Sequence, residues 1–181
     1  MDQSRLVKIS KYLSKHLRHQ PQRLGLTLEP GGWVLVDALL AACTRHGFPV
    51  SRAELDAVVS GNDKQRFGFD ATGTRIRAHQ GHSTPVDLQL EPAEPPPLLY
   101  HGTAEQFSDA IRRDGLLKMR RHHVHLSPDR ATAERVGARR GRVVVFVVDA
   151  AAMARAGYAF FRSTNGVWLV DHVPSAYLQQ A

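Results

Sequence analysis

The chain has 181 residues, of which 43% are apolar and 23% charged, a composition that excludes a disordered protein and allows one large domain or two small lobes. Its 24 lysine and arginine residues outnumber its 17 acidic residues, which gives a formal net charge of +7, and its 10 histidines can add to this charge on mild acidification. A basic surface favours anionic partners such as nucleic acids, nucleotides or acidic membranes.

The single cysteine, Cys43 in "LLAACTRHG", is more typical of a small core residue than of a nucleophile. It cannot form a disulfide framework, which fits a reducing compartment. The N-terminal "MDQSRLVKISKYL" lacks the apolar region of a signal peptide, and no apolar run is long enough to span a bilayer. We therefore expect a cytoplasmic protein with no membrane partner. The sequence has no coiled-coil pattern, and we expect a monomer.

Two lobes are predicted, because residues 84–97, "TPVDLQLEPAEPPP", are rich in proline and should form a stiff linker. The expected first lobe spans residues 1–83 and the second spans residues 98–181.

The first lobe begins with helices. A helical repeat of apolar side chains comes first: Leu6, Ile9, Leu13 and Leu17. Pro21 stops this helix. "WVLV" is a short strand, after which Asp37 caps a helix that runs to about Arg45. Ser51 and Glu54 form a capping box for a third helix.

A β-hairpin follows these helices, because "RFGFD" and "TRIRAH" flank a turn that contains glycine. Helices followed by a hairpin suggest a winged-helix arrangement, which is common among nucleic-acid-binding domains.

The second lobe alternates short strands and helices. "LLYHG", "HVHLS" and "RVVVFVVD" are expected strands, and "YAFFRS" and "VWLVDHV" are expected to pair around "TNG". Thr103 and Gln106 are expected to cap a helix that Gly115 ends, and further helices are expected at 129–139 and 150–156. The lobe is predicted to be α+β, with a mostly antiparallel sheet.

Two basic segments of the first lobe could carry chemistry. In "KHLRHQP", Arg18 and His19 lie at the end of the first helix, where cations complement the helix dipole. In "DKQRFGFD", Arg66 precedes a strand and could be a solvated edge residue. Taken alone, each segment favours the structural interpretation.

"YHGT", which includes His101, Gly102 and Thr103, is more distinctive. At the end of a strand that opens a helix, it could form a site for an anion or a ribose, because Gly102 would let a ligand approach the backbone. Thr103 could equally be an ordinary helix cap. These residues alone do not decide between the two.

"MRRHHVHLS", residues 119–127, places two arginines and three histidines in one stretch. In a strand, Arg121, His123 and His125 would share one face. Zinc is disfavoured because no cysteine or carboxylate lies nearby and the arginines would repel a cation. An anion-binding strand and a solvated basic edge strand both remain open. "QGHS" (80–83) and "STNGVWL" (163–169) read only as turns beside strands.

Taken together, the segments "KHLRH", "KQRFGF", "IRAHQGHS", "LYHGT", "MRRHHVHLS" and "GYAFFRSTNGVWLVDHVP" resemble the NAD-dependent RNA 2′-phosphotransferase family of the KptA type. They occur in the family's order from about Ser10 to Pro174. The resemblance implies an α+β fold with a winged-helix-like RNA lobe followed by an ADP-ribosyltransferase-like NAD lobe. Two departures from the family's pattern are the doubled "RRHH" and His79, where an asparagine is commoner.

The resemblance also implies which residues act. The catalytic quartet maps onto four positions, the last by counting two residues from Met119: Arg18, His19, Arg66 and Arg121. The NAD site maps onto a second set: His101, Gly102, Thr103, His125 and Ser127. NAD is consumed as a co-substrate, no metal is required, and the RNA partner is tRNA-like and carries a 2′-phosphate.

The implied reaction has two steps. The RNA 2′-phosphate attacks C1″ of the nicotinamide ribose and nicotinamide leaves, which gives a 2′-phospho-ADP-ribosylated RNA. The ribose O2″ then attacks the same phosphorus, which gives RNA with a free 2′-OH and ADP-ribose 1″,2″-cyclic phosphate.

Two alternatives remain open. An ADP-ribosyltransferase that caps terminal phosphates of nucleic acid would use the same arginines, whereas a protein-modifying one often needs a late glutamate, and none follows Glu134. A non-catalytic winged-helix nucleic-acid-binding protein would fit the charge and the first lobe, and release of nicotinamide distinguishes it from an enzyme.

Overall fold

A computed structural model describes residues 2–61 and 65–181. The chain forms two compact units, Met1–Gln89 and Leu90–Ala181, and their boundary falls inside the predicted proline-rich segment. Each unit has its own hydrophobic core, and the predicted α+β fold with two lobes is confirmed. Within the described residues, none of the helices has the length and apolar character needed to cross a bilayer.

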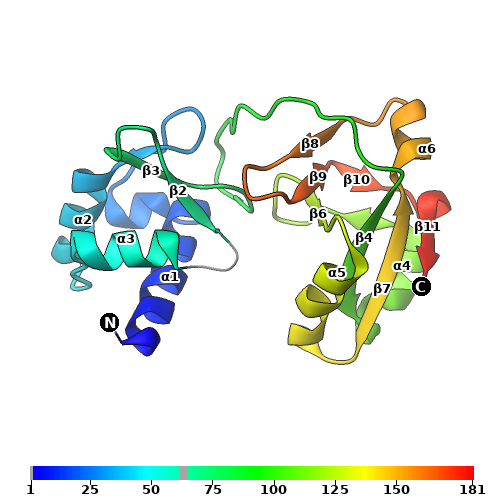
Figure 1. Ribbon diagram of the computed structural model, residues 1–181, viewed down its shortest axis with the longest axis horizontal. Helices are drawn as coiled ribbons and strands as arrows, with labels where there is room; N and C mark the ends of the chain where they lie inside the picture. The colour runs from blue at the N-terminus through cyan, green and yellow to red at the C-terminus, as the bar shows by residue number, and fades with distance from the viewer. Residues whose placement is uncertain (1, 62–64) are drawn as a thin grey trace. The chain divides into compact units, whose positions relative to one another are not determined.

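Unit 1 consists of helices packed around a small sheet (Figure 1). Its described elements are α1 (Gln3–Arg18), the 3-10 helix η1 (Pro21–Leu24), β1 (Val34–Leu35), α2 (Val36–Arg45), α3 (Arg52–Ser60), β2 (Phe67–Phe69) and β3 (Arg75–Ala78). The predicted apolar stripe holds α1 in place: Ile9, Leu13 and Leu17 are completely buried, and Leu6 packs against the same core. The predicted hairpin pairs β2 with β3, and β1 joins the other edge of β3.

Helix caps in unit 1 agree with the sequence in one case and differ in another. Ser51 and Glu54 form the predicted capping box of α3. The prediction that Asp37 caps the second helix is wrong, because α2 already begins at Val36 and Asp37 lies in its first turn. There its negative carboxylate interacts favourably with the positive end of the helix dipole and does not accept a cap hydrogen bond.

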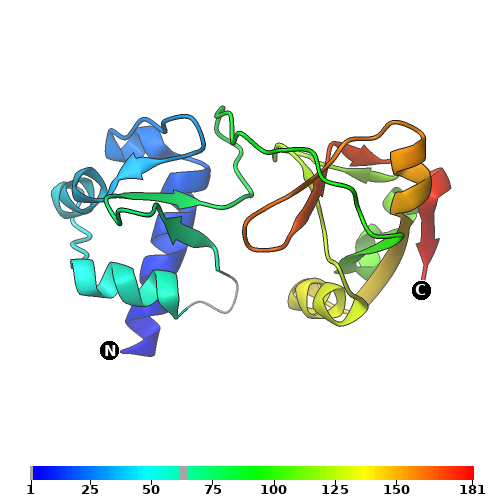
Figure 2. The same cartoon turned by 45° about the horizontal axis from the view of Figure 1, so that its top comes forward.

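Unit 2 is built from short antiparallel sheets with helices against them. Its described elements are β4 (Leu98–Ala104), η2 (Glu105–Phe107), α4 (Ser108–Asp114), β5 (Leu116–Leu117), β6 (Val124–Leu126), α5 (Arg130–Gly137), η3 (Ala138–Arg140), β7 (Val143–Asp149), α6 (Ala150–Arg155), β8 (Phe160–Arg162), β9 (Trp168–Val170), β10 (His172–Val173), η4 (Ser175–Tyr177) and β11 (Leu178–Gln180). The strand orders are β11-β7-β4, β6-β9-β8 and β10-β5. Figure 2 shows the long pair β4 and β7 with α5 beside them, and α5 contacts both strands.

The predicted end of the "LLYHG" strand is wrong. β4 continues to Ala104 because it pairs with β7 along its whole length, so Thr103 lies opposite Val144 and does not cap a helix. The helical segment after it begins at Glu105 as a short 3-10 helix and continues as α4 to Asp114.

The predicted strand in "MRRHHVHLS" is shorter than expected. Only Val124–Leu126 is β6, and the N–H of Arg121 donates to the carbonyl of Lys118 at 3.0 Å, which closes a turn. Met119 adopts a positive φ of 55°, which interrupts the extended backbone. The expectation that Arg121 and His123 belong to the same strand as His125 is therefore wrong.

Candidate functional site

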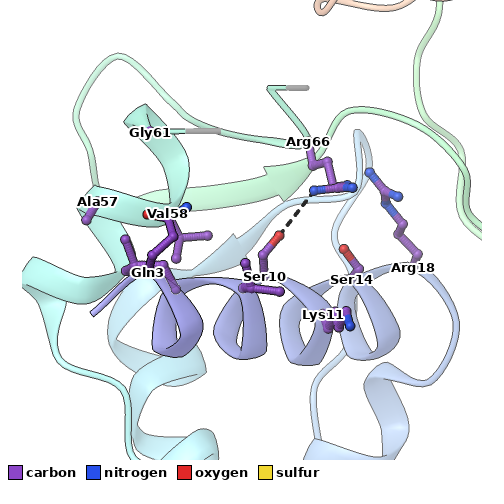
Figure 3. Close-up of a pocket in the computed structure, with 11 residues that line it drawn as sticks. Gln3, Ser10, Lys11, Ser14, Arg18, Ala57, Val58, Gly61 and Arg66 are labelled. Carbon is purple, nitrogen blue, oxygen red and sulfur yellow. Dashed lines mark hydrogen bonds between the residues drawn. The ribbon is translucent and has the colours of Figure 1, made fainter. Parts of the chain in front are cut away.

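Arg18 and Arg66, far apart in the sequence, line one cavity of about 490 Å³ in unit 1 (Figure 3). Arg18 is the last residue of α1, and Arg66 directly precedes β2. Nη1 of Arg66 donates to Oγ of Ser10 at 3.4 Å, and the guanidinium of Arg18 lies 5.9 Å from the ring centroid of Phe67. The hairpin and the first helix thus bring two predicted arginines to the same cavity.

His19, the residue that follows α1, is oriented by a loop far along the chain. Its Nδ1 lies 2.8 Å from Oγ of Ser83. The backbone N–H groups of Ser83 and Thr84 donate to the carbonyl of Arg18, at 2.9 and 3.2 Å. Sequence reasoning treated "QGHS" as a turn and missed Ser83, because no local pattern shows a contact of such long range.

His79, the residue that follows β3, supports Arg66. Its backbone N–H donates to the carbonyl of Arg66 at 3.0 Å, and its ring packs so closely on Gly68 that a Cβ there would lie 2.6 Å from the ring. Burial, with smaller contributions from Arg77 and Arg18, lowers the pKa of His79 below its usual value. A neutral imidazole therefore lies near Arg18, and the positive charge is left to the guanidiniums.

In unit 2, hydrogen bonds connect three of the predicted residues. Nδ1 of His101 lies 3.0 Å from the carbonyl of His125, and Nη1 of Arg121 lies 3.1 Å from Nδ1 of His125. Because a guanidinium only donates, Nδ1 of His125 accepts and the neutral ring carries its proton on Nε2. By the same logic His101 donates from Nδ1, which leaves Nε2 as an acceptor.

The surroundings of His101 favour its neutral form. Burial lowers its pKa most, and the charge of Arg121 lowers it further, while the hydrogen bond to His125 raises it. Ser127 lies beside this group because its N–H donates to the carbonyl of Tyr100 at 2.7 Å. The resulting cluster of imidazoles, guanidinium and hydroxyl can bind phosphate and ribose oxygens.

Gly102 lies so close to α5 that there is no space for a side chain at this position. A Cβ at this position would lie 1.7 Å from the carbonyl oxygen of Ala133 in α5, and a Cβ at Gly137 would lie 2.8 Å from the backbone nitrogen of Thr103. The two glycines let α5 approach β4 closely. The sequence predicts room for a ligand at Gly102, and in the structure α5 lies on the side where a Cβ would be.

The two adjacent arginines, Arg120 and Arg121, are both exposed. Nη1 of Arg121 lies within hydrogen-bond distance of His125, and the assignment of Arg121 by counting from Met119 stays a prediction. Three predicted residues gather in unit 1, namely Arg18, His19 and Arg66, and four in unit 2, namely His101, Arg121, His125 and Ser127. In the described parts of the chain, no three histidine, cysteine or carboxylate side chains are placed to share a metal ion.

Comparisons with known proteins agree on one family. The family described as RNA 2′-phosphotransferase, Tpt1/KptA, has a model that matches residues 4–172. A probable RNA 2′-phosphotransferase of Trichormus variabilis is 65% identical over 178 residues, which cover 98% of this chain and 98% of the relative. Similar proteins with the same description are 64% identical in Streptomyces coelicolor, over 99% of this chain and 97% of the relative, and 50% identical in Pseudomonas aeruginosa, over 100% of both.

Proposed function

Because the chain belongs to the RNA 2′-phosphotransferase family, Tpt1/KptA, we propose that it removes an internal 2′-phosphate from RNA by transferring it to NAD. The products are RNA with a free 2′-OH, nicotinamide and ADP-ribose 1″,2″-cyclic phosphate. The observation that carries the proposal is the cavity of unit 1, where Arg18 and Arg66 meet; among the described residues that line it, none is acidic.

In the first step, the 2′-phosphate must be held against the nicotinamide ribose. The bond from a phosphate oxygen to C1″ forms while the bond from C1″ to nicotinamide breaks, and nicotinamide leaves with the bonding electrons. Little acid catalysis is needed, so the task is positioning. We assign this task to Arg18, Arg66 and Arg121, because guanidiniums bind phosphate oxygens in a bidentate manner and keep their charge.

In the second step, O2″ attacks the phosphorus and the RNA 2′-oxygen leaves. Charge builds on the phosphoryl oxygens, which the same guanidiniums stabilise. A proton must leave O2″ and one must reach the departing oxygen. We assign proton transfer or phosphate bonding to His19, because an exposed imidazole exchanges protons near neutral pH.

We propose that unit 2 binds NAD and unit 1 binds RNA through its winged-helix-like arrangement. The imidazoles of His101 and His125 and the hydroxyl of Ser127 fit the ribose and phosphate oxygens of NAD, and Gly102 and Thr103 belong to the same strand. The arginines supply the charge stabilisation for which other phosphoryl transferases use magnesium, so we expect no metal requirement. We further propose a cytoplasmic monomer whose one, buried cysteine suits a reducing compartment.

The test is to incubate the protein with NAD and a short RNA carrying one internal 2′-phosphate, with EDTA present. We expect 2′-OH RNA, nicotinamide and the cyclic phosphate. Arg121→Ala should nearly abolish these products, whereas Arg120→Ala, a matched loss of one exposed arginine, should leave them within about twofold.

Other outcomes would identify the alternatives. Nicotinamide release with an ADP-ribosylated RNA end, and no 2′-phosphate removal, would indicate capping of terminal phosphates. Absence of nicotinamide release would indicate a non-catalytic nucleic-acid-binding protein. Wild-type turnover by Arg121→Ala would remove the assigned role of that arginine.

A further inference from the structure

The cavity that contains Arg18 and Arg66 extends well beyond these two side chains. It continues along α1 and is closed on the other side by the C-terminal part of α3 (Figure 3). Its volume of about 490 Å³ is in the range of pockets that hold small organic ligands, roughly 300–1,000 Å³, and exceeds what one phosphate group needs. The two arginines therefore account for only one end of it.

The remaining lining has two kinds of surface. Ser10, Lys11 and Ser14 lie on consecutive turns of α1 before Arg18, and Ser10 already holds Arg66 through a hydrogen bond. Farther from Arg18, the lining is mostly apolar: Leu6, Val7, Ala57 and Val58. Val7 is 44% exposed, so its side chain is accessible to a ligand in the cavity.

The charge of the lining selects the occupant. Among the described residues, the lining contains Lys11, Arg18 and Arg66 and no aspartate or glutamate. Lys11 is exposed, so its ammonium can meet a phosphate without the cost of a buried charge. Hydroxyls at Ser10 and Ser14 suit phosphate and sugar oxygens, and apolar side chains suit the face of a base. A single-stranded polynucleotide offers phosphates, sugar oxygens and the face of a base, which match the basic, hydroxyl and apolar parts of the lining.

We propose that this cavity, the α1 groove, binds the nucleotide next to the one that carries the 2′-phosphate. Lys11 pairs with the adjoining phosphodiester, Ser14 binds its oxygens, and the adjoining base lies on Val7. This inference rests on the proposed function for the place of the 2′-phosphate at Arg18 and Arg66. It makes α1 the element that distinguishes an internal 2′-phosphate within a strand from a free nucleotide.

The experiment compares Lys11→Glu with Lys8→Glu. Both lysines are exposed on α1, both substitutions change the net charge equally, and Lys8 does not line the groove. Binding is measured without NAD for two probes: a hexaribonucleotide with one internal 2′-phosphate and adenosine 2′-monophosphate, which has no neighbour. Lys11→Glu should weaken hexamer binding about tenfold or more, as for a lost charge-assisted contact, and Lys8→Glu less than about twofold.

Two further readouts separate a direct contact from a general charge effect. The slope of log affinity against log salt for the hexamer should become shallower by about 0.7 in Lys11→Glu and should not change in Lys8→Glu. Affinity for adenosine 2′-monophosphate should stay within about twofold in both. Val7→Trp, at an exposed position, should change hexamer affinity alone.

Each outcome decides something. Equal effects of Lys11→Glu and Lys8→Glu, or equal loss for both probes, would overturn the α1 groove as a subsite for the neighbouring nucleotide. Hexamer affinity unchanged by Val7→Trp would overturn the placement of the base. If the wild type turns over but Lys11→Glu behaves like Lys8→Glu, the proposed function stands and this inference fails. If Lys11→Glu is selective but the wild type releases no nicotinamide, the groove stands and the proposed function fails.

Discussion

Ser83→Ala tests how His19 is held in place. The substitution removes the hydroxyl that lies 2.8 Å from Nδ1 of His19 but keeps the backbone N–H that binds the carbonyl of Arg18. A net hydrogen bond contributes about 0.5–1.5 kcal/mol, and His19 is exposed, so water competes and the lower part of this range, about 0.5–1 kcal/mol, applies. At about 1.4 kcal/mol per tenfold change in rate, we expect kcat to fall about two- to fivefold.

The assay is single-turnover removal of an RNA 2′-phosphate with saturating NAD, followed across pH. His19→Ala should cost about 10²–10⁴ in rate if the imidazole transfers a proton. Ser83→Ala should keep most activity but shift the pH profile, because it changes the hydrogen bond at Nδ1. Ser83→Thr, which restores a hydroxyl, should recover the wild-type profile. An unchanged pH profile in Ser83→Ala, or a loss as large as that of His19→Ala, would refute the reasoning.

Two further predictions concern the stability of the fold. Gly102→Ala places a methyl 1.7 Å from a backbone oxygen of α5 that cannot move cheaply, so it should destabilise by about 3 kcal/mol, whereas Gly157→Ala, with φ of 93° and no atom within 4 Å, should cost only about 1–2 kcal/mol. Thermal unfolding of the two variants measures the difference, and equal melting temperatures would contradict the close approach of α5 to β4. His79 and His101 have pKa values held below the usual 6.5, chiefly by burial, so the unfolded chain binds more protons as pH falls through about 6.5. The free energy of unfolding should therefore decrease from about pH 7.5 to about pH 5, above the range in which carboxylates titrate, and a constant value over this interval would count against the burial of these rings.

The features that the sequence predicts well are local ones. The apolar stripe of α1, the capping box of α3 and the hairpin of β2 and β3 depend on residues within a few positions of one another. Such patterns determine backbone conformation directly, and the structure agrees with them. The resemblance to a family also predicts that Arg18 and Arg66 act together, but only the fold places them at one cavity.

The features that the sequence misses depend on contacts between distant segments. Nothing near Gly102 in the sequence indicates that Ala133 of α5 packs against it, so the local pattern predicts only space for a ligand. The pairing of β4 with β7 extends the strand through Thr103, which local cap chemistry alone assigned to a helix. Arg121 leaves the expected strand because a turn closed by Lys118 precedes β6.

One short segment connects both arginines of unit 1. The N–H of His79 holds the carbonyl of Arg66, and the N–H groups of Ser83 and Thr84 hold the carbonyl of Arg18. The start of the segment 79–84 therefore anchors the backbone of Arg66, and its end anchors the backbone of Arg18. Both arginines line the cavity. Since a misplacement of about 1 Å can cost about 10²-fold in rate, we expect a change in the length of this segment to lower activity. Residues 79–84, "HQGHST", thus hold the backbone at both arginines, and we propose that they act as the scaffold of the phosphate site.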